Sequence, residues 1–441
     1  MFKTLKEAFK MKDVRRRILL TLLLLFVYRL GCWIPIPGID PSMFYDAVHS
    51  GTGASDFLGL LSSVAGGALS NGAILALGVG PYITSSIIMQ LLTIAIPALE
   101  RLRKQGDEGR RKIAIYTRYA ALVMSLAQAI AIVMSLGVGN HIQSNLFGNS
   151  LGGASTFLIS AIVVLVLVAG SMFTVWVGDK ITENGIGNGM SMLVFVGILS
   201  TAMRAFVQSI EQTVVNIDQI VVPIVFIIAL TIIFFLIVFV DLAERRIPVT
   251  YAKQVKGNKM YGGQNANIPI KINAVGVIPI IFAFSLIQFP QLIISIFWPG
   301  SKAYTGYASV MGAGHWLNIV LTALLILGFS YFYASLSFNP DDVSRQIQQN
   351  GGFILGYRPG PPTRDYLRKV SNRITLFGAI FLMFMSLVPS VIFKAIPTLN
   401  GSGLTGAFSA IGMLIVVSVA LEFDKQLQGH LLMKTYKGFL K

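Results

Sequence analysis

Residues 101–112 read RLRKQGDEGRRK, and this basic stretch lies between two long apolar runs, residues 73–98 and 113–137. The arrangement recurs along the chain, because an even number of apolar runs separates each basic cluster from the next. The four clusters are Lys3–Arg17, Arg101–Lys112, Arg245–Lys271 and Arg345–Arg373. An even number of membrane crossings returns a chain to its starting side, so this alternation predicts a membrane protein whose basic segments all face one compartment.

The composition also indicates a chain that lies in a bilayer. Hydrophobic residues make up 54% and charged residues 12% of the 441 residues, which is far from the mixture of a soluble domain. We expect ten spans, most of them near the roughly 20 residues that cross the hydrocarbon layer. They are residues 18–34, 73–98, 113–137, 156–178, 187–207, 219–240, 272–297, 316–338, 372–393 and 404–424. The predicted fold class is an all-α polytopic membrane protein.

The distribution of positive charge predicts the orientation. Segments on the side of the N-terminus hold 31 of the 35 Lys and Arg, the opposite segments hold three, and Arg29 lies inside the first run. Such a bias over short loops predicts that both termini and all four clusters are cytoplasmic. Trp33, Trp298 and Trp316 fall at outer span ends and Trp176 at an inner end, where interfacial anchors are expected.

The sequence lacks recognisable catalytic and metal-binding motifs. The single cysteine, Cys32, excludes an internal disulfide and a Cys-based metal site. The four histidines are far apart at no metal-ligand spacing, and no HExxH, Walker A or GxSxG motif occurs. The chain is therefore predicted to be no enzyme, with no metal and no cofactor.

One stretch does not fit a simple span. Residues 55–96 are too long for one crossing, and their first part carries Asp56, Gly59 and the Gly66–Gly67 pair. A short helix that enters from outside and turns back would suit this pattern, and an outer helix lying on the bilayer is the alternative. Non-helical backbone at membrane depth is tolerated only against protein or a water-filled cavity, so the re-entrant interpretation implies a cavity.

Two cytoplasmic loops, residues 241–271 and 339–373, are longer than topology alone requires. The first holds a β-branched run with Arg245 and Arg246, which predicts a small hairpin. The second holds Arg358 between proline and glycine residues, which favours a stiff tip over a helix interior. Basic loops near a membrane commonly serve topology or anionic lipid. Because these loops are long and structured, we expect a docking surface for a large partner, one whose phosphates Lys and Arg can neutralise.

The predicted spans contain neutral polar residues instead of the carboxylates that ion-coupled carriers use. Gln90, Gln128 and Gln288 lie in the second, third and seventh spans. Such amides either hydrogen-bond a neighbouring helix or mark a weak seam that can part. Apolar pairs at helical spacing either pack or line a passage; they are Ile83 with Ile87, Met190 with Val194 and Val277 with Ile281.

Four motifs, in order along the chain, resemble the SecY family of protein-conducting channels. They are GAILALGVGPYITSSIIMQ at 72–90, ITENGIGNG at 181–189, GVIPIIFA at 276–283 and GYRPG at 356–360. The resemblance covers essentially the whole chain. It implies two inverted five-span halves, residues 1–210 and 215–441, around a central pore, with a short re-entrant plug helix at about 55–69.

The resemblance also implies roles for individual residues. The pore ring would consist of six apolar side chains: Ile83, Ile87, Met190, Val194, Ile281 and Ile415. The family often has isoleucine at all six positions, so Met190 and Val194 depart from the pattern and put the diameter of the ring in doubt. A lateral gate would lie between the second and third spans and the seventh and eighth, with Gln90, Gln128 and Gln288 as its polar seam.

The implied function is passive conduction of unfolded preproteins across the bacterial cytoplasmic membrane and lateral release of membrane spans into lipid. The SecA ATPase or the ribosome, including its rRNA, would dock at Arg245, Arg246 and Arg358 and drive movement. Further expected partners are SecE, SecG, signal peptides, nascent preproteins and the lipid bilayer. The alternatives are a secondary transporter with inverted repeats, which leaves the docking loops unexplained, and a membrane scaffold, which leaves the re-entrant segment unexplained.

Overall fold

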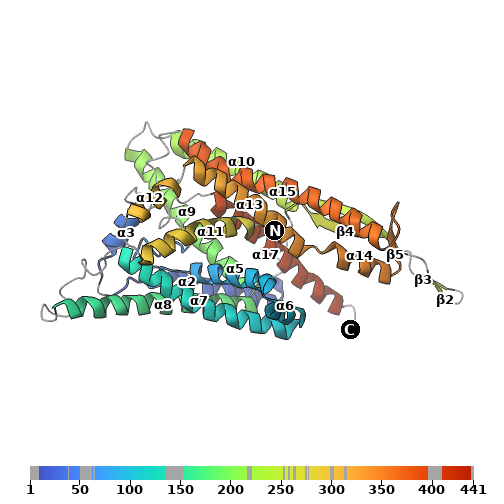
Figure 1. Cartoon of the computed structure of the whole chain (residues 1–441), viewed down its shortest axis with the longest axis horizontal. Coiled ribbons are helices and arrows are strands. Elements are labelled where there is room, and N and C mark those ends of the chain that lie inside the picture. Colours follow the sequence, from blue (N-terminus) through green and yellow to red (C-terminus); the bar gives the residue numbers. More distant parts are fainter. Residues whose placement is uncertain are drawn as a thin grey trace. The chain divides into compact units, whose positions relative to one another are not determined.

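The computed structural model describes residues 9–37, 39–49, 62, 65–135, 152–215, 221–251, 254–256, 259–261, 265–273, 276, 278–297, 302–311, 315–395 and 410–438. The described chain is mostly helical, and a helix lies in each of the ten predicted runs (Figure 1). These helices are α2 (Lys12–Gly31), α5 (Gly80–Ala95), α7 (Asp107–Ser135), α8 (Gly152–Asn184), α9 (Gly189–Val215), α10 (Val221–Leu242), α11 (Ile278–Phe297), α13 (Trp316–Ser337), α15 (Pro361–Ala395) and α17 (Ala410–Gly438).

Length and hydropathy identify membrane-spanning candidates among these helices. Within the described residues, five helices are long and apolar enough to cross a bilayer, or six if the bent pair α5 and α6 (Pro97–Lys104) counts as one span. The remaining predicted runs contain helices that are shorter in the described part or richer in charge. The prediction of ten crossings therefore stays a prediction.

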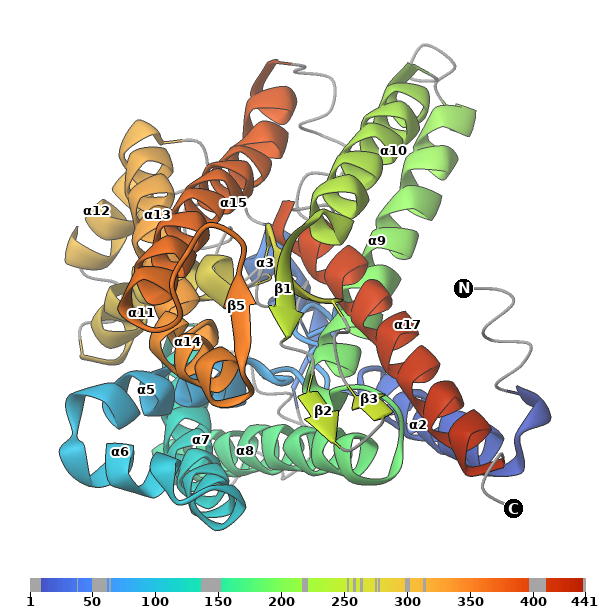
Figure 2. The ribbon, with the colours of Figure 1, turned by 90° about the vertical axis from the view of Figure 1, so that its right-hand side faces the viewer.

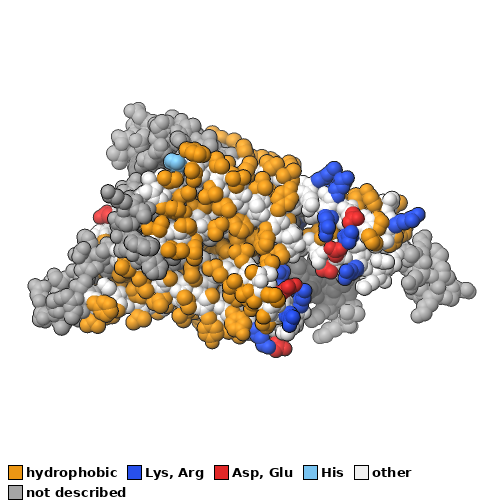
Figure 3. Space-filling view, in the orientation of Figure 1, with side chains coloured by type: hydrophobic (Ala, Val, Ile, Leu, Met, Phe, Trp, Pro, Cys, Tyr) orange, Lys and Arg blue, Asp and Glu red, His pale blue; other side chains and the backbone are white. Residues whose placement is uncertain are grey.

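Four shorter helices lie outside the ten runs or at their ends: α3 (Pro41–His49), α6, α12 (Lys302–Met311) and α14 (Pro340–Gln349). The helix α6 bends away from α5 by 99° at Ile96, because Pro97 starts a new helix there. Figure 3 shows a broad apolar surface over the long helices, with Lys and Arg gathered over α6 and around α14.

The chain forms two compact units, and the chain crosses between them more than once. Unit 1 comprises Met1–Ile224, Ser285–Asn318 and Phe393–Lys441, and unit 2 comprises Val225–Phe284 and Ile319–Ile392. Within unit 1, Val14 and Ile18 of α2 pack with Leu427 and Leu431 of α17. The two inverted halves are a statement about chain topology, and they stay a prediction.

The centre of unit 1 is a non-helical segment, residues 65–79. The prediction of a span starting at residue 73 is wrong in this detail, because α5 begins only at Gly80. Gly66, Gly67, Gly72 and Gly78 all have positive φ, a conformation that interrupts a helix and favours glycine. The segment is nevertheless deeply buried, since Ala68, Ala73 and Val79 have no exposed surface.

Unit 2 contains a three-stranded antiparallel sheet in the order β4 (Asn265–Lys271), β1 (Glu244–Tyr251), β5 (Gly352–Ile354). A separate hairpin, β2 (Gln254–Lys256) with β3 (Lys259–Tyr261), lies between β1 and β4 in the sequence. The predicted hairpin in the first loop is thus confirmed, and its sheet gains a strand from the second loop. These strands are the exception to the all-α prediction.

A small hydrophobic core binds the two loops together. Ile247 and Val249 of β1, Ile270 of β4 and Ile354 of β5 pack with Ile347 of α14 and Leu367 of α15. Figure 2 shows β5 beside β1, next to α14 and the start of α15. Neither loop supplies this core alone, so the loops fold as one platform.

We expect Leu367→Ala to loosen this platform, because Leu367 is fully buried in its core. Loss of a buried leucine side chain costs about 2–5 kcal/mol. Amide hydrogen exchange of residues 244–251 and 352–354 should therefore accelerate in the variant. The matched control is Leu355→Ala, because Leu355 is 68% exposed and its truncation should change stability by less than about 0.5 kcal/mol. Equal protection in both variants would contradict the shared core.

Candidate functional site

The residues predicted for a pore ring occupy three helices of unit 1 and one helix segment of unit 2. Ile83 and Ile87 are one turn apart on α5, Met190 and Val194 are one turn apart on α9, and Ile415 is on α17. Ile87, Val194 and Ile415 are buried, with 5–8% exposure, and Ile83, Met190 and Ile281 are half-buried. Because Ile281 belongs to unit 2, closure of a ring by all six stays a prediction.

The side chain of Met190 lies against α8. A Cβ added at Gly178 of α8 would lie 2.6 Å from Met190 Sδ, so glycine leaves the space that the thioether occupies. A Cβ at Gly189 would likewise meet the carbonyl of Gly178, which shows how closely the start of α9 approaches α8. Close helix approach through small residues is typical of membrane bundles.

The ITENGIGNG motif ties α8, α9 and α2 together. The Gly189 N–H donates to Thr182 Oγ1 at 2.9 Å, and the Ile186 N–H donates to Thr21 Oγ1 of α2 at 3.2 Å. Asn188 Oδ1 accepts from the Met190 N–H at 3.1 Å and so caps the first turn of α9. The motif therefore fixes where α9, which carries Met190 and Val194, begins.

The three predicted gate glutamines have different surroundings. Gln90 is exposed on α5, and its Nε2 donates to Ser86 Oγ one turn earlier at 3.2 Å. Gln128 of α7 is 8% exposed, and its Oε1 is buried with no hydrogen-bond partner among the described residues. Gln288 is on α11, and its side chain lies outside the described residues. The structure therefore brings no two of them into hydrogen-bond contact in the part that it describes.

The predicted plug, about 55–69, lies mostly outside the described residues, but its base is described. Arg29 of α2 donates from Nη1 to the Gly66 carbonyl at 2.6 Å. Arg204 of α9 donates from Nη1 to Asn71 Oδ1 at 3.3 Å, and Asn71 Nδ2 donates to the Cys32 carbonyl at 3.3 Å. We call residues 65–72 the basal turn.

Backbone contacts also hold the basal turn and the residues that follow it. The Ile36 N–H donates to the Gly72 carbonyl at 2.8 Å, and the Ile74 N–H donates to the Ile34 carbonyl at 3.0 Å. A Cβ at Gly170 of α8 would collide with the Ile74 carbonyl, so α8 packs directly on this backbone. The polar groups of a non-helical segment in an apolar interior thus find partners from three sides of the chain: α2, the 34–36 stretch and α9.

The predicted docking arginines all lie in unit 2 and are exposed. Arg245 and Arg246 open β1, opposite Ile270 and Pro269 of β4. Side chains alternate along a strand, so Arg245 is on the face of buried Ile247 and Arg246 is on the other face. There Arg246 Nε donates to Glu244 Oε1 at 2.8 Å. The two neighbouring arginines therefore offer charge on different faces of the sheet.

Arg358 lies in a short turn, Gly356–Gly360, between β5 and α15. Both glycines have positive φ, +85° and +100°. The Thr363 hydroxyl donates to the Arg358 carbonyl at 2.7 Å, and the buried Ser344 hydroxyl of α14 donates to the Gly360 carbonyl at 2.9 Å. The prediction that Arg358 lies in a non-helical turn is confirmed, and its stiffness stays a prediction.

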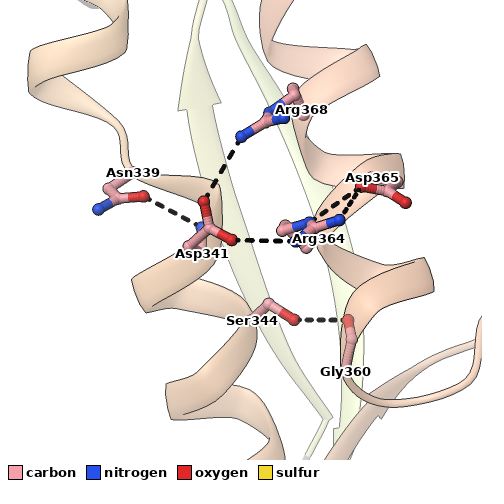
Figure 4. A network of polar contacts seen from close by, with 7 residues as sticks. All are labelled: Asn339, Asp341, Ser344, Gly360, Arg364, Asp365 and Arg368. Atoms are coloured by element: carbon pink, nitrogen blue, oxygen red, sulfur yellow. Dashed lines mark hydrogen bonds and ion pairs between the residues drawn. The ribbon is translucent and has the colours of Figure 1, made fainter.

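An acidic residue of α14 contacts two arginines near the start of α15 (Figure 4). Asp341 lies 3.6 Å from Arg364 Nη1 and 3.5 Å from Arg368 Nη2, and Arg364 also contacts Asp365 at 2.9 Å. Asn339 caps α14 by accepting from the Asp341 N–H at 3.1 Å. These ion pairs are exposed to solvent, so each contributes little to stability. The two α15 arginines are thereby engaged, and Arg358 is outside this network.

Three exposed apolar side chains precede Arg358 in the chain. Phe353, Leu355 and Tyr357 are 38%, 68% and 42% exposed, and the Tyr357 ring stacks on Tyr366 at 4.2 Å between centroids. An arginine beside exposed aromatic and aliphatic residues is the composition of a protein-binding surface. We call Phe353, Leu355, Tyr357 and Arg358 the tip surface.

Within the described residues, no group of three or more His, Cys, Asp or Glu is placed so that it could hold a metal ion. Sequence reasoning missed Asn71, Ser344 and Asp341 as structural partners. Arg29 and Arg204 could have indicated Asn71, because an arginine within or beside an apolar run needs a hydrogen-bond partner.

Known proteins resemble this chain over nearly its full length. The SecY family model matches residues 73–423. The protein translocase subunit SecY of Streptomyces coelicolor is 38% identical over 440 residues, which cover 99% of this chain and 99% of that protein.

Two solved structures share the fold at low identity. A structure described as a protein-conducting channel has a TM-score of 0.60 at 20% identity and covers 94% of this chain and 92% of its own. Sec61 in the canine ribosome–channel complex from the endoplasmic reticulum has a TM-score of 0.57 at 18% identity, with the same coverage. At these identities the likeness concerns the fold.

We expect Gly360→Ala to loosen the turn that carries Arg358. A side chain at a φ of +100° is strained by about 1–2 kcal/mol. The backbone can relieve that strain by changing φ at residue 360. This change should break the hydrogen bond that the Arg364 N–H donates to the Gly360 carbonyl at 3.1 Å. Amide hydrogen exchange of residues 355–364 should accelerate. Gly429→Ala is the control, because Gly429 lies in α17 with nothing within 4 Å of an added Cβ. An unchanged exchange rate in Gly360→Ala would show that the turn tolerates other backbone angles.

Proposed function

The chain belongs to the SecY family, and from that membership we propose how its described residues conduct a polypeptide through a bilayer. As a SecY-family protein it is a multi-pass membrane subunit of a protein-conducting channel and not an enzyme. The secondary-transporter alternative has no support among the relatives. The observation that carries the assignment is the 38% identity to a protein translocase subunit over 99% of both chains.

The proposed passage is an apolar constriction. Ile83, Ile87, Met190, Val194, Ile281 and Ile415 form its ring, with Met190 and Val194 in positions where isoleucine is common in the family. An apolar constriction excludes water and ions by dewetting, while flexible side chains can close around an extended polypeptide of any sequence. A charged ring would instead retain oppositely charged segments. The half-buried Ile83 and the buried Ile87, both in the first two turns of α5, support a place for this ring directly after the basal turn.

The proposed exit into lipid is a seam between the second and third spans and the seventh and eighth. Its three members are Gln90 on α5, Gln128 on α7 and Gln288 on α11, and all three belong to unit 1. The buried Oε1 of Gln128, which has no partner among the described residues, supports a seam of modest strength. An unsatisfied buried acceptor costs about 1–3 kcal/mol and so weakens the packing around it. A signal sequence or membrane span would part the seam through its own hydrophobicity.

The proposed docking platform for a cytoplasmic partner is the sheet and tip of unit 2. Arg245, Arg246 and Arg358 would contact the SecA motor ATPase or the ribosome, including phosphates of its RNA. The canine Sec61 relative of this fold is part of a ribosome–channel complex, which supports the ribosome as one such partner. The stiff turn at Arg358 also supports this role, because a pre-ordered side chain loses less entropy on binding.

We further propose ten membrane crossings, with both termini in the cytoplasm of a bacterial cell and the plug at about residues 55–69 on the outer side of the ring. SecE would brace the two halves, residues 1–210 and 215–441, and SecG would be the third membrane subunit. Signal peptides and nascent preproteins are the substrates. The positive-inside distribution of Lys and Arg supports the orientation.

The function is tested by reconstitution of the purified chain with SecE and SecA in lipid vesicles. A signal-bearing precursor should become protected from protease only when ATP is present. Omission of the chain and omission of the signal sequence are the controls. Protection that does not depend on the chain would reject the proposed channel.

Arg358→Glu is expected to lower the rate of motor-driven translocation by about tenfold or more. The partner surface that binds the Arg358 cation would then face a negative charge and be repelled. The rate is measured in the same vesicles at matched amounts of assembled channel. Arg110→Glu, an exposed change in the second basic cluster, is the control and should leave the rate near that of the wild type. Normal translocation by Arg358→Glu would remove this residue from the platform.

Gln90→Leu and Gln288→Leu are expected to admit precursors with weakened signal sequences, since an apolar seam offers a hydrophobic segment a better surface. One interhelical amide contributes about 0.6–2 kcal/mol, so the yield of such precursors should rise about threefold or more. Gln208→Leu on α9 is the control, because Gln208 is exposed outside the gate helices. Signal-sequence stringency identical to that of the wild type in both gate variants would refute the seam.

A further inference from the structure

Two arginines from two helices of unit 1 hold the same non-helical turn. Arg29 of α2 binds the Gly66 carbonyl at 2.6 Å, and Arg204 of α9 binds Asn71 Oδ1 at 3.3 Å. The guanidinium carbon of Arg204 also lies 5.2 Å from the Trp33 ring centroid, within the range of a cation–π contact. Both arginines are half-buried. The basal turn is thus attached at both ends by charged donors.

These contacts do not neutralise the two charges. Among the described residues, no ion pair joins Arg29 or Arg204 to a carboxylate; the two side chains instead contact a carbonyl, a side-chain amide and an aromatic ring. Cationic side chains are costly at membrane depth and are retained there when they perform a task. A neutral donor would satisfy a carbonyl at a lower desolvation cost. We therefore attribute the arginines to their long side chains and to the strength of the charge-assisted hydrogen bonds that they donate.

The space around the turn is tight. A Cβ at Gly66 would lie 2.7 Å from Arg29 Nη1 and 3.0 Å from the Cα of Gly197 on α9, and a Cβ at Gly67 would lie 3.6 Å from Arg204 Nη1. Gly66 and Gly67 have φ of +71° and +81°. A side chain at Gly66 would therefore collide with its neighbours, whereas Gly67 is favoured by its left-handed backbone conformation and not by lack of space.

The first two proposed ring residues, Ile83 and Ile87, lie a short distance after the basal turn in the chain. Buried residues 73–79 join it to α5, where the Ile83 N–H closes the first helical turn on the Val79 carbonyl at 3.1 Å. The intervening backbone packs closely against Gly170 of α8 at Ile74, so we expect a displacement at Gly66 or Asn71 to shift Ile83 and Ile87 as well.

We propose that Arg29 and Arg204 are positioning residues that pin the basal turn to α2 and α9 and so keep the apolar seal closed when no substrate is present. The inference rests on the proposed channel function and adds the residues that set its resting state. Opening then requires the contacts of Arg29 and Arg204 with the basal turn to break. Loss of either arginine contact would leave the residues of the ring unchanged but would shift their positions.

The test measures potassium leak from vesicles that contain the reconstituted chain with SecE and no precursor. Arg29→Leu should raise the leak about tenfold, the change expected when one charge-assisted hydrogen bond is lost. Arg29→Lys keeps the charge with a shorter reach and should fall between Arg29→Leu and the wild type. Asn71→Ala removes the acceptor of Arg204 without changing any charge and should also raise the leak. Each variant should in addition translocate a precursor with a weakened signal sequence.

The control for a merely structural role is Leu427→Ala. Leu427 is fully buried in the α2–α17 cluster, away from the basal turn in sequence and contacts, so its truncation should lower the yield of folded channel without raising the leak per channel. If Arg29→Leu does not assemble, Arg29→Lys and Asn71→Ala decide. Wild-type leak and stringency in assembled Arg29→Lys and Asn71→Ala would overturn the inference while leaving the channel function standing. Failure of the wild-type chain to translocate any precursor is the separate result that overturns the proposed function.

Discussion

Hydrogen bonding of non-helical backbone inside an apolar interior is the constraint on which unit 1 depends. Residues 65–79 break the helical pattern with four left-handed glycines, yet they are among the most buried in the chain. Water cannot satisfy their polar groups there, so side chains and a short backbone pairing must do so. Arg29, Asn71 and the 34–36 stretch supply those partners, and Gly170 lets α8 close over the result. The helices of unit 1 are thus arranged around a segment that is not a helix.

Unit 2 solves the opposite problem, which is to hold an exposed turn still. The Gly356–Gly360 turn gains little from burial, and its order comes from local hydrogen bonds to Ser344 and Thr363 and from a core a few residues away. The ion pairs of Asp341 add modest support. In the proposed docking platform, such order would leave Arg358 in one arrangement before a partner binds, which lowers the entropy lost on binding.

Much of this architecture follows from patterns that have a simple physical cause. Apolar length and one-sided charge predict helices at all ten runs, and proline and glycine around Arg358 predict its non-helical tip. The start of α5 at Gly80 was not predictable from hydropathy, since residues 73–79 are as apolar as any span. Strand β5 was missed because three residues are too few for a periodic signal, and its pairing with β1 depends on a register set by Val249 and Ile354. The contacts of Arg29 and Arg204 could be predicted only from which helices are neighbours, and a local sequence pattern does not contain that information.

The pairing of β5 with β1 has a consequence for the order in which the chain matures. About a hundred residues separate the two strands, including α11 and α13, and Leu367 completes their shared core later still. During synthesis, the edge of β1 that pairs with β5 stays unpaired until the intervening helices and the second loop have left the ribosome. The newly made chain therefore cannot display a finished platform until more than four-fifths of it exists. An incomplete chain therefore lacks the shared core that orders the proposed docking platform.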